Sequence, residues 1–490
     1  MKGLCTITIR TIKIGRVSTG GVERQTCNAR CVTNTNVEEL VVYKCDISTH
    51  LHLPDHAAVE AMQIVQNIRE LAAEQPNARP SDVIRTGVGN VEEEVSVKLP
   101  EENHLKRMVN RRQNKERPRL PGPNTVNFEI TAPYDRTRSD QLFLLYNSGR
   151  EGANRTLIFS TSENLRILAA SDTLLTDGTF KVVPRQFLQL YTLHGVILDT
   201  VFPFVFVLTT RKDEGTYADI YRQVKDIAAE LDIHFSFQFL NTDFEAANIN
   251  AVKEALPNAR IVGCLFHFSQ SLWRQIVSRG LRADYLNTEE PELRRNLLEL
   301  MALPFIPPAD LVETFIFLYE EIDDALTEFA TYVDHTYVRG KPARGRRRAV
   351  PPLFPPETWN VYNLVLADRI RTNNAVEGFH SKFNQIVGTH HANIWKLIDA
   401  FKKVQQDTER TLTQAQGGHR RFKPPVSKKY TTNQAMIANI VRNYQHYKDT
   451  NSLKKYLRAL FFVCFPNKVI SCLKLSRFEY SSSPQTFRTS

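Results

Sequence analysis

The sequence predicts an α/β protein whose core is a mixed β-sheet covered by helices. Apolar runs of strand length, separated by Gly, Pro, Asn and Asp, follow one another between residues 141 and 210. Between residues 216 and 280, stretches of helical periodicity alternate with such runs. After residue 280 only the helical spacing continues, which predicts an all-helical insertion.

The composition favours a large folded protein with a polyanionic partner. The 490 residues are 42% hydrophobic and 10% aromatic, which is enough for a buried core. Lys and Arg outnumber Asp and Glu by 63 to 53, so the formal net charge is +10. This modest excess of positive charge suits a nucleic acid.

The cysteine count and the hydropathy pattern favour a reducing cell interior. Four of the seven cysteines lie in the first 45 residues (Cys5, Cys27, Cys31 and Cys45), unlike the spacing of an evenly stapled secreted scaffold. No apolar run reaches the roughly 18 residues of a membrane span. The N-terminus also lacks the unbroken apolar core of a signal peptide, so secretion is not expected.

The first 123 residues predict two segments that precede the core. Residues 1–55 contain short alternations of polar and apolar side chains, which indicate a small β-rich unit. Residues 56–123 begin with helical periodicity, and Pro and Gly then interrupt it. The seven basic residues within 106–119 form either a solvated linker or an arm that contacts phosphate.

Residues 124–280 are predicted to form the first part of an RNase H-like core. Three strands in a meander followed by alternating helices and strands is the RNase H order. The predicted strands are 141–146, 156–160, 173–183, 187–198, 201–210, 237–243 and 260–266, and the predicted helices are 216–231, 245–256 and 268–280.

The remaining residues predict an insertion, a return to the core and a C-terminal region. Residues 281–368 form the helical insertion, in which the basic, Pro-rich stretch 339–356 loops out and could touch DNA. Residues 369–410 return to the core with a helix, and 411–490 hold further helices and a tail expected to be disordered.

Three acidic residues stand where such a core would hold metal ions. Asp177 and Asp243 end apolar runs of strand type, and Glu377 opens a polar stretch compatible with a helix. Cleaving and joining phosphodiesters uses two ions about 4 Å apart, and carboxylates suit Mg²⁺. We expect Asp177 to bridge both ions, Asp243 to bind one and Glu377 the other. The alternative is that the two Asp are turn residues and Glu377 is a surface residue.

The chain resembles the MULE transposase domain of Mutator-like DNA elements. The resemblance runs from about Phe128 to Val387 and rests on the motifs at residues 142–149, 177–180 (Asp-Gly-Thr-Phe), 189–195, 242–245 (Thr-Asp-Phe-Glu), 263–274 and 371–380. The family's DDE triad maps onto Asp177, Asp243 and Glu377. The resemblance therefore implies a nuclear DNA transposase that uses Mg²⁺ or Mn²⁺, acts on the terminal repeats and target of its element as double-stranded DNA, and works as a homo-oligomer.

Three further residues match or flank these motifs. Cys264 and His267 match the Cys-x-x-His signature of this transposase group, at a junction between a strand and a helix. The pair alone cannot complete a tetrahedral zinc site, so it is either structural or placed near the cleaved strand. His380 lies three residues after Glu377 and could orient that carboxylate or contact a phosphate.

Proteins with this domain often carry an N-terminal FLYWCH-type zinc finger, and residues 1–55 resemble a degenerate one. Cys27, His50 and His52 resemble the latter ligands of such a finger and could bind Zn²⁺, with Cys5 or Cys31 as a fourth ligand. The Tyr-Trp-x-Cys portion is missing, since no Trp precedes Trp273.

Three functions remain open at this point. The first is an active DDE transposase that cleaves DNA at element ends and transfers strands. The second is a domesticated or decayed DNA-binding protein that keeps the fold without catalysis. The third, a metal-dependent nuclease without strand transfer, has the same sequence signature as the first.

Overall fold

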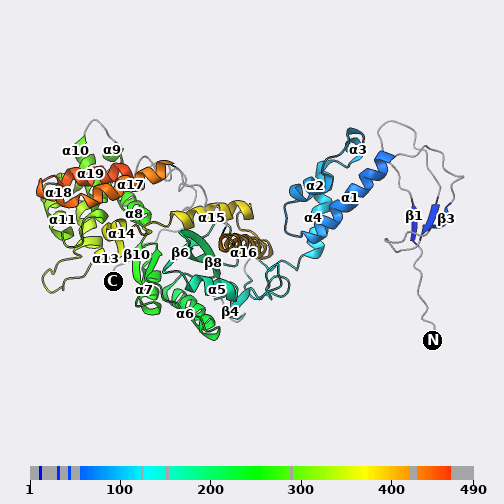
Figure 1. Cartoon of the computed structure of the whole chain (residues 1–490), viewed down its shortest axis with the longest axis horizontal. Coiled ribbons are helices and arrows are strands. Elements are labelled where there is room, and N and C mark those ends of the chain that lie inside the picture. The colour runs from blue at the N-terminus through cyan, green and yellow to red at the C-terminus, as the bar shows by residue number, and fades with distance from the viewer. Residues whose placement is uncertain are drawn as a thin grey trace. The chain divides into compact units, whose positions relative to one another are not determined.

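The computed structural model describes residues 56–122, 125–149, 154–286, 291–418 and 428–464, together with three short strands before residue 46. The chain divides into two compact units, residues 1–118 and 119–490. Each unit has its own helices and strands, labelled in Figure 1.

The first unit begins with a small antiparallel sheet. Its strands are β1 (Arg10–Lys13), β2 (Arg30–Thr33) and β3 (Val42–Cys45), in the order β1-β2-β3. Cys31 lies opposite Cys45 in the register. Cys27, His50 and His52 lie outside the described residues, so zinc binding there stays a prediction.

Four helices follow where the sequence predicted one helix and a linker. They are α1 (His56–Glu74), α2 (Pro80–Val88), α3 (Glu93–Lys98) and α4 (Glu102–Glu116). Pro80 occupies the first position of α2, and Gly89, at φ +59°, ends it. The Pro and Gly residues therefore mark helix boundaries, as is common for these two residues.

The helices of the first unit share a small core of their own. It is formed by Ile68, Ala72, Val83, Ile84, Leu105 and Val109. A Cβ at Gly87 would come within 2.5 Å of Ile68 Cγ1, so the absent side chain lets α2 approach α1 closely. Five of the seven basic residues of the predicted linker lie on α4 (Lys106, Arg107, Arg111, Arg112 and Lys115), where Lys106 pairs with Glu102 at 2.6 Å.

The second unit is built on a seven-stranded mixed sheet in the order β10-β9-β6-β7-β8-β5-β4. Its strands are β4 (Leu144–Asn147), β5 (Thr156–Phe159), β6 (Thr173–Thr179), β7 (Gln189–Ile197), β8 (Thr200–Thr209), β9 (Phe239–Thr242) and β10 (Arg260–Gly263). Strands β6, β9 and β10 run parallel, and the pairs from β6 through β4 are antiparallel. This is the α/β class that the sequence predicted.

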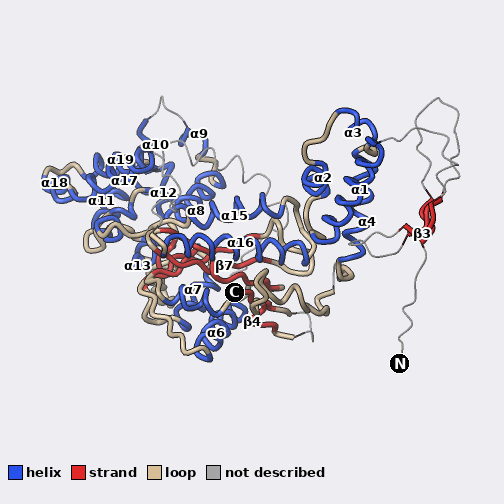
Figure 2. The backbone as a smooth tube through the Cα atoms, turned by 45° about the vertical axis from the view of Figure 1, so that its right-hand side comes forward, coloured by secondary structure: helices blue, strands red, loops and turns tan. Residues whose placement is uncertain are grey.

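Helices cover both faces of this sheet. The helices of this part are α5 (Ser162–Ala169), α6 (Glu214–Glu230), α7 (Ala246–Ala255), α8 (Leu265–Ser278), α15 (Asn374–Val387) and α16 (Ile394–Gln416). Alternate residues of β8 face opposite sides: Val205 packs in the cluster with α6, and Phe206 packs in the cluster with α16. Figure 2 shows α16 on one side of the red strands and α6 on the other.

A second helical body follows α8. It contains α9 (Arg282–Leu286), α10 (Pro291–Met301), η2 (Leu303–Phe305), α11 (Leu311–Glu320), η3 (Asp324–Leu326), α12 (Thr327–Val333), η4 (Asp334–Val338), α13 (Pro356–Trp359) and α14 (Tyr362–Leu366). The helices of this body lie within residues 281–368, the range of the predicted helical insertion, and the Pro-rich stretch between η4 and α13 contains no helix.

The C-terminal helices pack on this insertion. They are α17 (Lys428–Arg442), α18 (Tyr444–Asp449) and α19 (Leu453–Cys464). Tyr456 Oη donates a hydrogen bond of 2.6 Å to the carbonyl of Phe305, and Arg458 pairs with Glu299 at 2.6 Å. The region that the sequence separated as C-terminal therefore belongs to the body of the insertion. None of the helices in the described part of the chain combines the length and apolarity that crossing a bilayer requires.

Candidate functional site

Asp177 lies on the central strand β6, between the antiparallel β7 and the parallel β9. Its side chain is largely buried, with 9% of the residue exposed. One carboxylate oxygen accepts a hydrogen bond of 2.9 Å from the Gly178 amide, and the other lies 3.4 Å from His380 Nδ1. The sheet and the helix above it therefore fix the position of this carboxylate.

Asp243 directly follows β9, which is the parallel neighbour of β6. Parallel strands end at the same edge of a sheet, so this register brings Asp243 to the end of β6 where Asp177 lies. Burial raises the pKa of Asp243 to about 6, while the charge of His267 lowers it and the carboxylate of Asp177 raises it. The Asp243 carboxylate is thus costly to ionise without a compensating cation.

Glu377 lies in the first turn of α15, and Asn373 fixes the start of that helix. The Asn373 side-chain amide donates to the carbonyl of Thr176 at 3.1 Å, and its backbone amide donates to Cys264 Sγ at 3.1 Å. These bonds tie α15 to the residue before Asp177 and to the end of β10. Burial raises the pKa of Glu377, His267 lowers it, and Asp177 raises it.

His267, in the first turn of α8, lies among the acidic residues. Its Nε2 is 3.9 Å from Glu377 Oε1. Burial lowers the pKa of His267, but contact with Cys264 and the charges of Asp177 and Asp243 outweigh it and raise the pKa to about 10. Both His267 Nδ1 and Glu377 Oε1 are buried and have no hydrogen-bond partner.

His380 contacts Asp177, although the sequence predicted a contact with Glu377 or a phosphate. Besides Asp177, its ring reaches Thr192 Oγ1 at 3.1 Å, and that hydroxyl lies 2.9 Å from His194 Nε2. Thr192 Oγ1 also donates to the carbonyl of Asp177 at 3.3 Å. This buried polar layer on β7 orients Asp177, and the sequence analysis did not predict it. The sequence contains one indication of this layer: Thr192 and His194 are polar and two residues apart, so they share one face of a strand.

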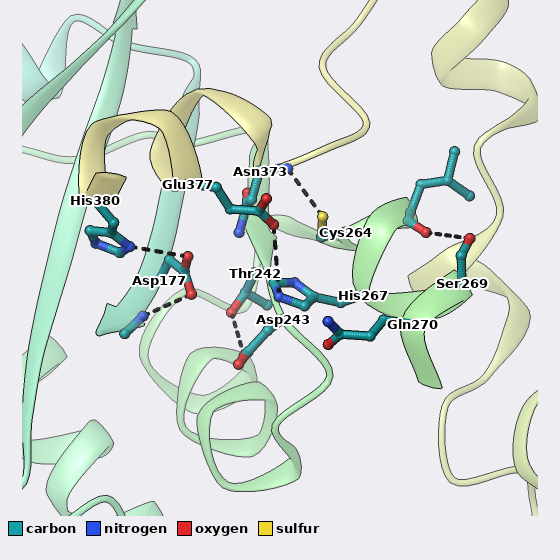
Figure 3. A network of polar contacts seen from close by, with 12 residues as sticks. Asp177, Thr242, Asp243, Cys264, His267, Ser269, Gln270, Asn373, Glu377 and His380 are labelled. Carbon is teal, nitrogen blue, oxygen red and sulfur yellow. Dashed lines mark hydrogen bonds and ion pairs between the residues drawn. The ribbon is translucent and has the colours of Figure 1, made fainter. Parts of the chain in front are cut away.

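Figure 3 shows the carboxylates of Asp177, Asp243 and Glu377 in one region, with His267 extending between them from α8. The Asp243 carboxylate turns toward the Thr242 hydroxyl, at 3.5 Å. Asp177 on β6, Asp243 after β9 and Glu377 on α15 therefore lie near the same edge of the sheet, but their carboxylates do not form one compact group of potential ligands.

The tightest group of potential metal ligands differs from the predicted one. Cys264, His267 and Glu377 each offer a donor atom within 4.8 Å of the others, and among the described residues no other such group of three or more occurs. Glu377 thus belongs to this group as well as to the predicted triad. A positively charged His267 between the acidic groups explains why Glu377 lies close to it.

Carboxylates are suitable ligands for a divalent cation. Hard ions such as Mg²⁺ prefer oxygen donors, and one buried carboxylate oxygen of Glu377 has no hydrogen-bond partner. Within the described residues, the ion-pair partners of Asp177 and Glu377 are imidazoles, not Lys or Arg. A bound cation would remove the cost of burying these charges.

Comparison with known proteins gives one match to a family. Residues 173–271, about a fifth of the chain, match the MULE transposase domain. The matched range runs from β6 into α8, so it contains Asp177, Asp243, Cys264 and His267, and it ends well before Glu377. No curated protein matches the chain.

The comparison with solved structures gives a weak likeness. The Drosophila P element transposase strand transfer complex is 10% identical, and the alignment covers 85% of this chain and 94% of that chain with a TM-score of 0.23. A TM-score this low carries no argument about fold or function.

Proposed function

We propose that this protein is a DDE-type DNA transposase of the Mutator-like class. The observation that carries the proposal is that Asp177 on β6 and Asp243 directly after the parallel strand β9 lie at the same end of the sheet and within a match to the MULE transposase domain. Glu377 lies nearby on α15. On this proposal the protein cleaves double-stranded DNA at the ends of its element and transfers the strands to target DNA. It would act in the nucleus as a homo-oligomer.

The strand order supports an RNase H-like core within this proposal. A meander of β6, β7 and β8 is followed by β9 and β10, which return through α6 and α7 to run parallel to β6. This places β6 at the centre of the five strands, with β5 and β4 as an extension beyond β8. The carboxyl ends of β6 and β9 then carry the two Asp residues.

Asp177, Asp243 and Glu377 would hold Mg²⁺ or Mn²⁺. Such ions, when bound, activate the attacking oxygen and neutralise charge on the leaving oxygen. The chain supplies their position: His380 contacts the carboxylate of Asp177, Thr192 donates to the main-chain carbonyl of Asp177, and Asn373 fixes the helix that carries Glu377. His267 adds a positive charge beside the same acidic groups, where it can also attract a phosphate.

Strand cleavage with a labelled DNA duplex tests this proposal. The wild-type chain should nick the ends of its element in Mg²⁺ or Mn²⁺, and Asp177→Asn, Asp243→Asn and Glu377→Gln should each lower cleavage by about 10³-fold, or roughly 4 kcal/mol. Asp226→Asn, on the exposed face of α6, is the matched control and should cleave normally. Equal cleavage by any of the three site variants and the control would overturn the proposal.

One observation favours a second candidate function. Glu377 has its nearest potential ligand partners in Cys264 and His267, with Asp177 and Asp243 outside that group. A DNA-binding protein that retains the fold without catalysis would tolerate this arrangement. Duplex binding by a wild-type chain that cleaves in neither metal would favour this second candidate.

A further inference from the structure

A short basic arm projects from the helical insertion between η4 and α13. We define the basic arm as residues 341–350. Its two halves pair antiparallel through bridges at Lys341 and Val350 and at Arg344 and Arg347, with backbone hydrogen bonds of 2.8 and 3.1 Å. Gly345, at φ +58°, lies in the turn. The arm therefore has a defined backbone although it lies in a loop between helices.

The basic arm concentrates positive charge. Five of its ten residues are cations (Lys341, Arg344, Arg346, Arg347 and Arg348), and it contains no acidic residue. All five are exposed, and none has an ion pair or side-chain hydrogen bond with the part of the chain that the structure describes. Like charges packed this closely repel one another, so the arm suits a polyanionic partner that neutralises them.

The base of the arm is fixed, in contrast to its exposed tip. Arg339 makes two hydrogen bonds to the Asp334 carboxylate, at 2.8 and 2.7 Å. Gly340 has φ +83°, and a Cβ there would lie 2.2 Å from the carbonyl oxygen of Val350. Only glycine therefore lets the two halves of the arm meet at this point. The contacts of Arg339 and Gly340 therefore fix the direction in which the arm leaves the insertion.

The arm is rooted beside the candidate metal site. The ring of Phe244, the residue after Asp243, packs against Phe354 at 5.0 Å and Tyr337 at 6.2 Å between ring centroids. These two aromatic residues flank the arm in the sequence. A Cβ at Gly263 would lie 2.4 Å from the Phe244 ring, so the missing side chain makes the space for this contact.

The length of the arm suits a DNA groove. The four residue steps from Gly340 to Arg344 span about 13 Å in an extended conformation, close to the ~12 Å width of a major groove. An arm whose flanking residues Tyr337 and Phe354 contact Phe244, the neighbour of Asp243, can therefore extend toward phosphates of a duplex held at the carboxylates.

We propose that the basic arm binds the phosphate backbone of the DNA duplex whose strand lies at Asp177, Asp243 and Glu377. This inference rests on the proposed function, since it takes the carboxylate edge as the place of the cleaved strand. The guanidinium groups at the tip neutralise phosphates without reading bases, so the arm adds affinity and holds the duplex at the site.

Salt-dependent binding to a fluorescently labelled DNA duplex tests the arm. The full chain is compared with a variant in which Arg344, Arg346, Arg347 and Arg348 are all changed to Gln, in EDTA so that no strand is cut. Each lost phosphate contact should reduce the slope of log affinity against log salt by about 0.9, and affinity at low salt should fall by about tenfold or more. Replacing the same four residues by Lys should restore most of the binding.

The matched control changes four exposed cations outside the arm (Arg222, Lys225, Lys253 and Lys403) to Gln. It removes the same charge from α6, α7 and α16 and should weaken binding much less. Both variants should keep the melting temperature of the wild type. Equal losses of DNA affinity in the two variants, or an unchanged salt slope in the arm variant, would overturn the proposal. A wild-type chain that binds RNA or an acidic peptide but not duplex DNA would also overturn it.

Cleavage separates this inference from the proposed function. If the wild-type protein cleaves DNA and the arm variant binds with the wild-type salt slope, the inference about the arm is wrong and the proposed function stands. Wild-type protein that never cleaves in Mg²⁺ or Mn²⁺, but loses duplex affinity when the arm is neutralised, contradicts the catalytic proposal and supports the arm.

Discussion

Two regions of the second unit bury acidic side chains, and they differ in the residues that lie beside the buried carboxylates. In the insertion, Glu299 is fully buried and its carboxylate pairs with Arg458 at 2.6 Å. At the edge of the sheet, Asp177 and Glu377 face imidazoles, and burial raises the pKa of Glu377 and Asp243 as it also raises that of Glu299. The insertion places an arginine, a permanent cation, beside its acid, whereas the sheet edge places histidines beside its acids. Under the proposed function, this difference supports a cation site at the sheet edge.

Removing the cation of the insertion should have the largest effect on stability. Arg458→Met leaves the Glu299 carboxylate buried without a partner, which should lower the free energy of unfolding by about 3–5 kcal/mol. Urea denaturation measures this change. Arg410→Met, which breaks an exposed pair with Asp407, is the control and should cost less than about 1 kcal/mol. Similar losses in both variants would remove the contrast between the two regions.

The polar layer on β7 should matter for metal affinity. Thr192→Val removes the hydroxyl that links Asp177, His380 and His194, so Asp177 loses its orientation and Mn²⁺ affinity should fall by about tenfold. Thr209→Val is the matched control, since the Thr209 hydroxyl is buried on β8 without a hydrogen-bond partner. Isothermal titration with Mn²⁺ compares the two, and a loss in the control as large as in Thr192→Val would contradict the role of this layer.

Neutralising the sheet edge should stabilise the metal-free protein. Asp243→Asn removes a charge that burial disfavours, so the free energy of unfolding should rise by on the order of 1 kcal/mol at pH 7. Asp310→Asn, whose carboxylate accepts hydrogen bonds from Lys448 and Tyr444 at 2.8 and 2.9 Å, should instead lower it. Changes of the same sign in both variants would contradict the comparison.

The pH dependence of the free energy of unfolding gives a second test of Asp243→Asn. The pKa of Asp243 is raised in the folded protein to about 6, so the folded state binds this proton more tightly than the unfolded state. Its contribution to stability is therefore present at low pH and is lost as the pH rises from about 4 to about 6. Asp243→Asn should abolish this component of the unfolding free energy, measured in chelator across that range.

The sequence predicted the central strands well and the short helices poorly. Strands β6 to β10 fall within the predicted runs, except that β8 begins one residue earlier, because continuous apolar residues and β-branched side chains mark buried strands. Helix α5 was missed because its eight residues make only about two turns, too few for a clear period. Helices α2 to α4 were missed because Pro80 and Gly89 mark helix ends as well as loops.

The strand positions of two acidic residues were predictable, and their surroundings were not. Asp177 and Asp243 follow strand-type runs, and this position can be recognised from local sequence. The contacts of Asn373 with Thr176 and Cys264 join residues far apart in the chain, and no local pattern predicts them. The contacts of His380 with Asp177 and Thr192 are a similar case. They form because α15 crosses β6 and β7, and no local pattern predicts that crossing.

Electron paramagnetic resonance of Mn²⁺ titrated into the wild-type protein and into Asp177→Asn and Glu377→Gln tests the central claim most directly. The account predicts specific Mn²⁺ binding by the wild type that each substitution weakens, while Glu299→Gln in the insertion leaves it unchanged. Mn²⁺ binding of equal strength in all of these proteins would contradict the claim that the sheet edge is a cation site.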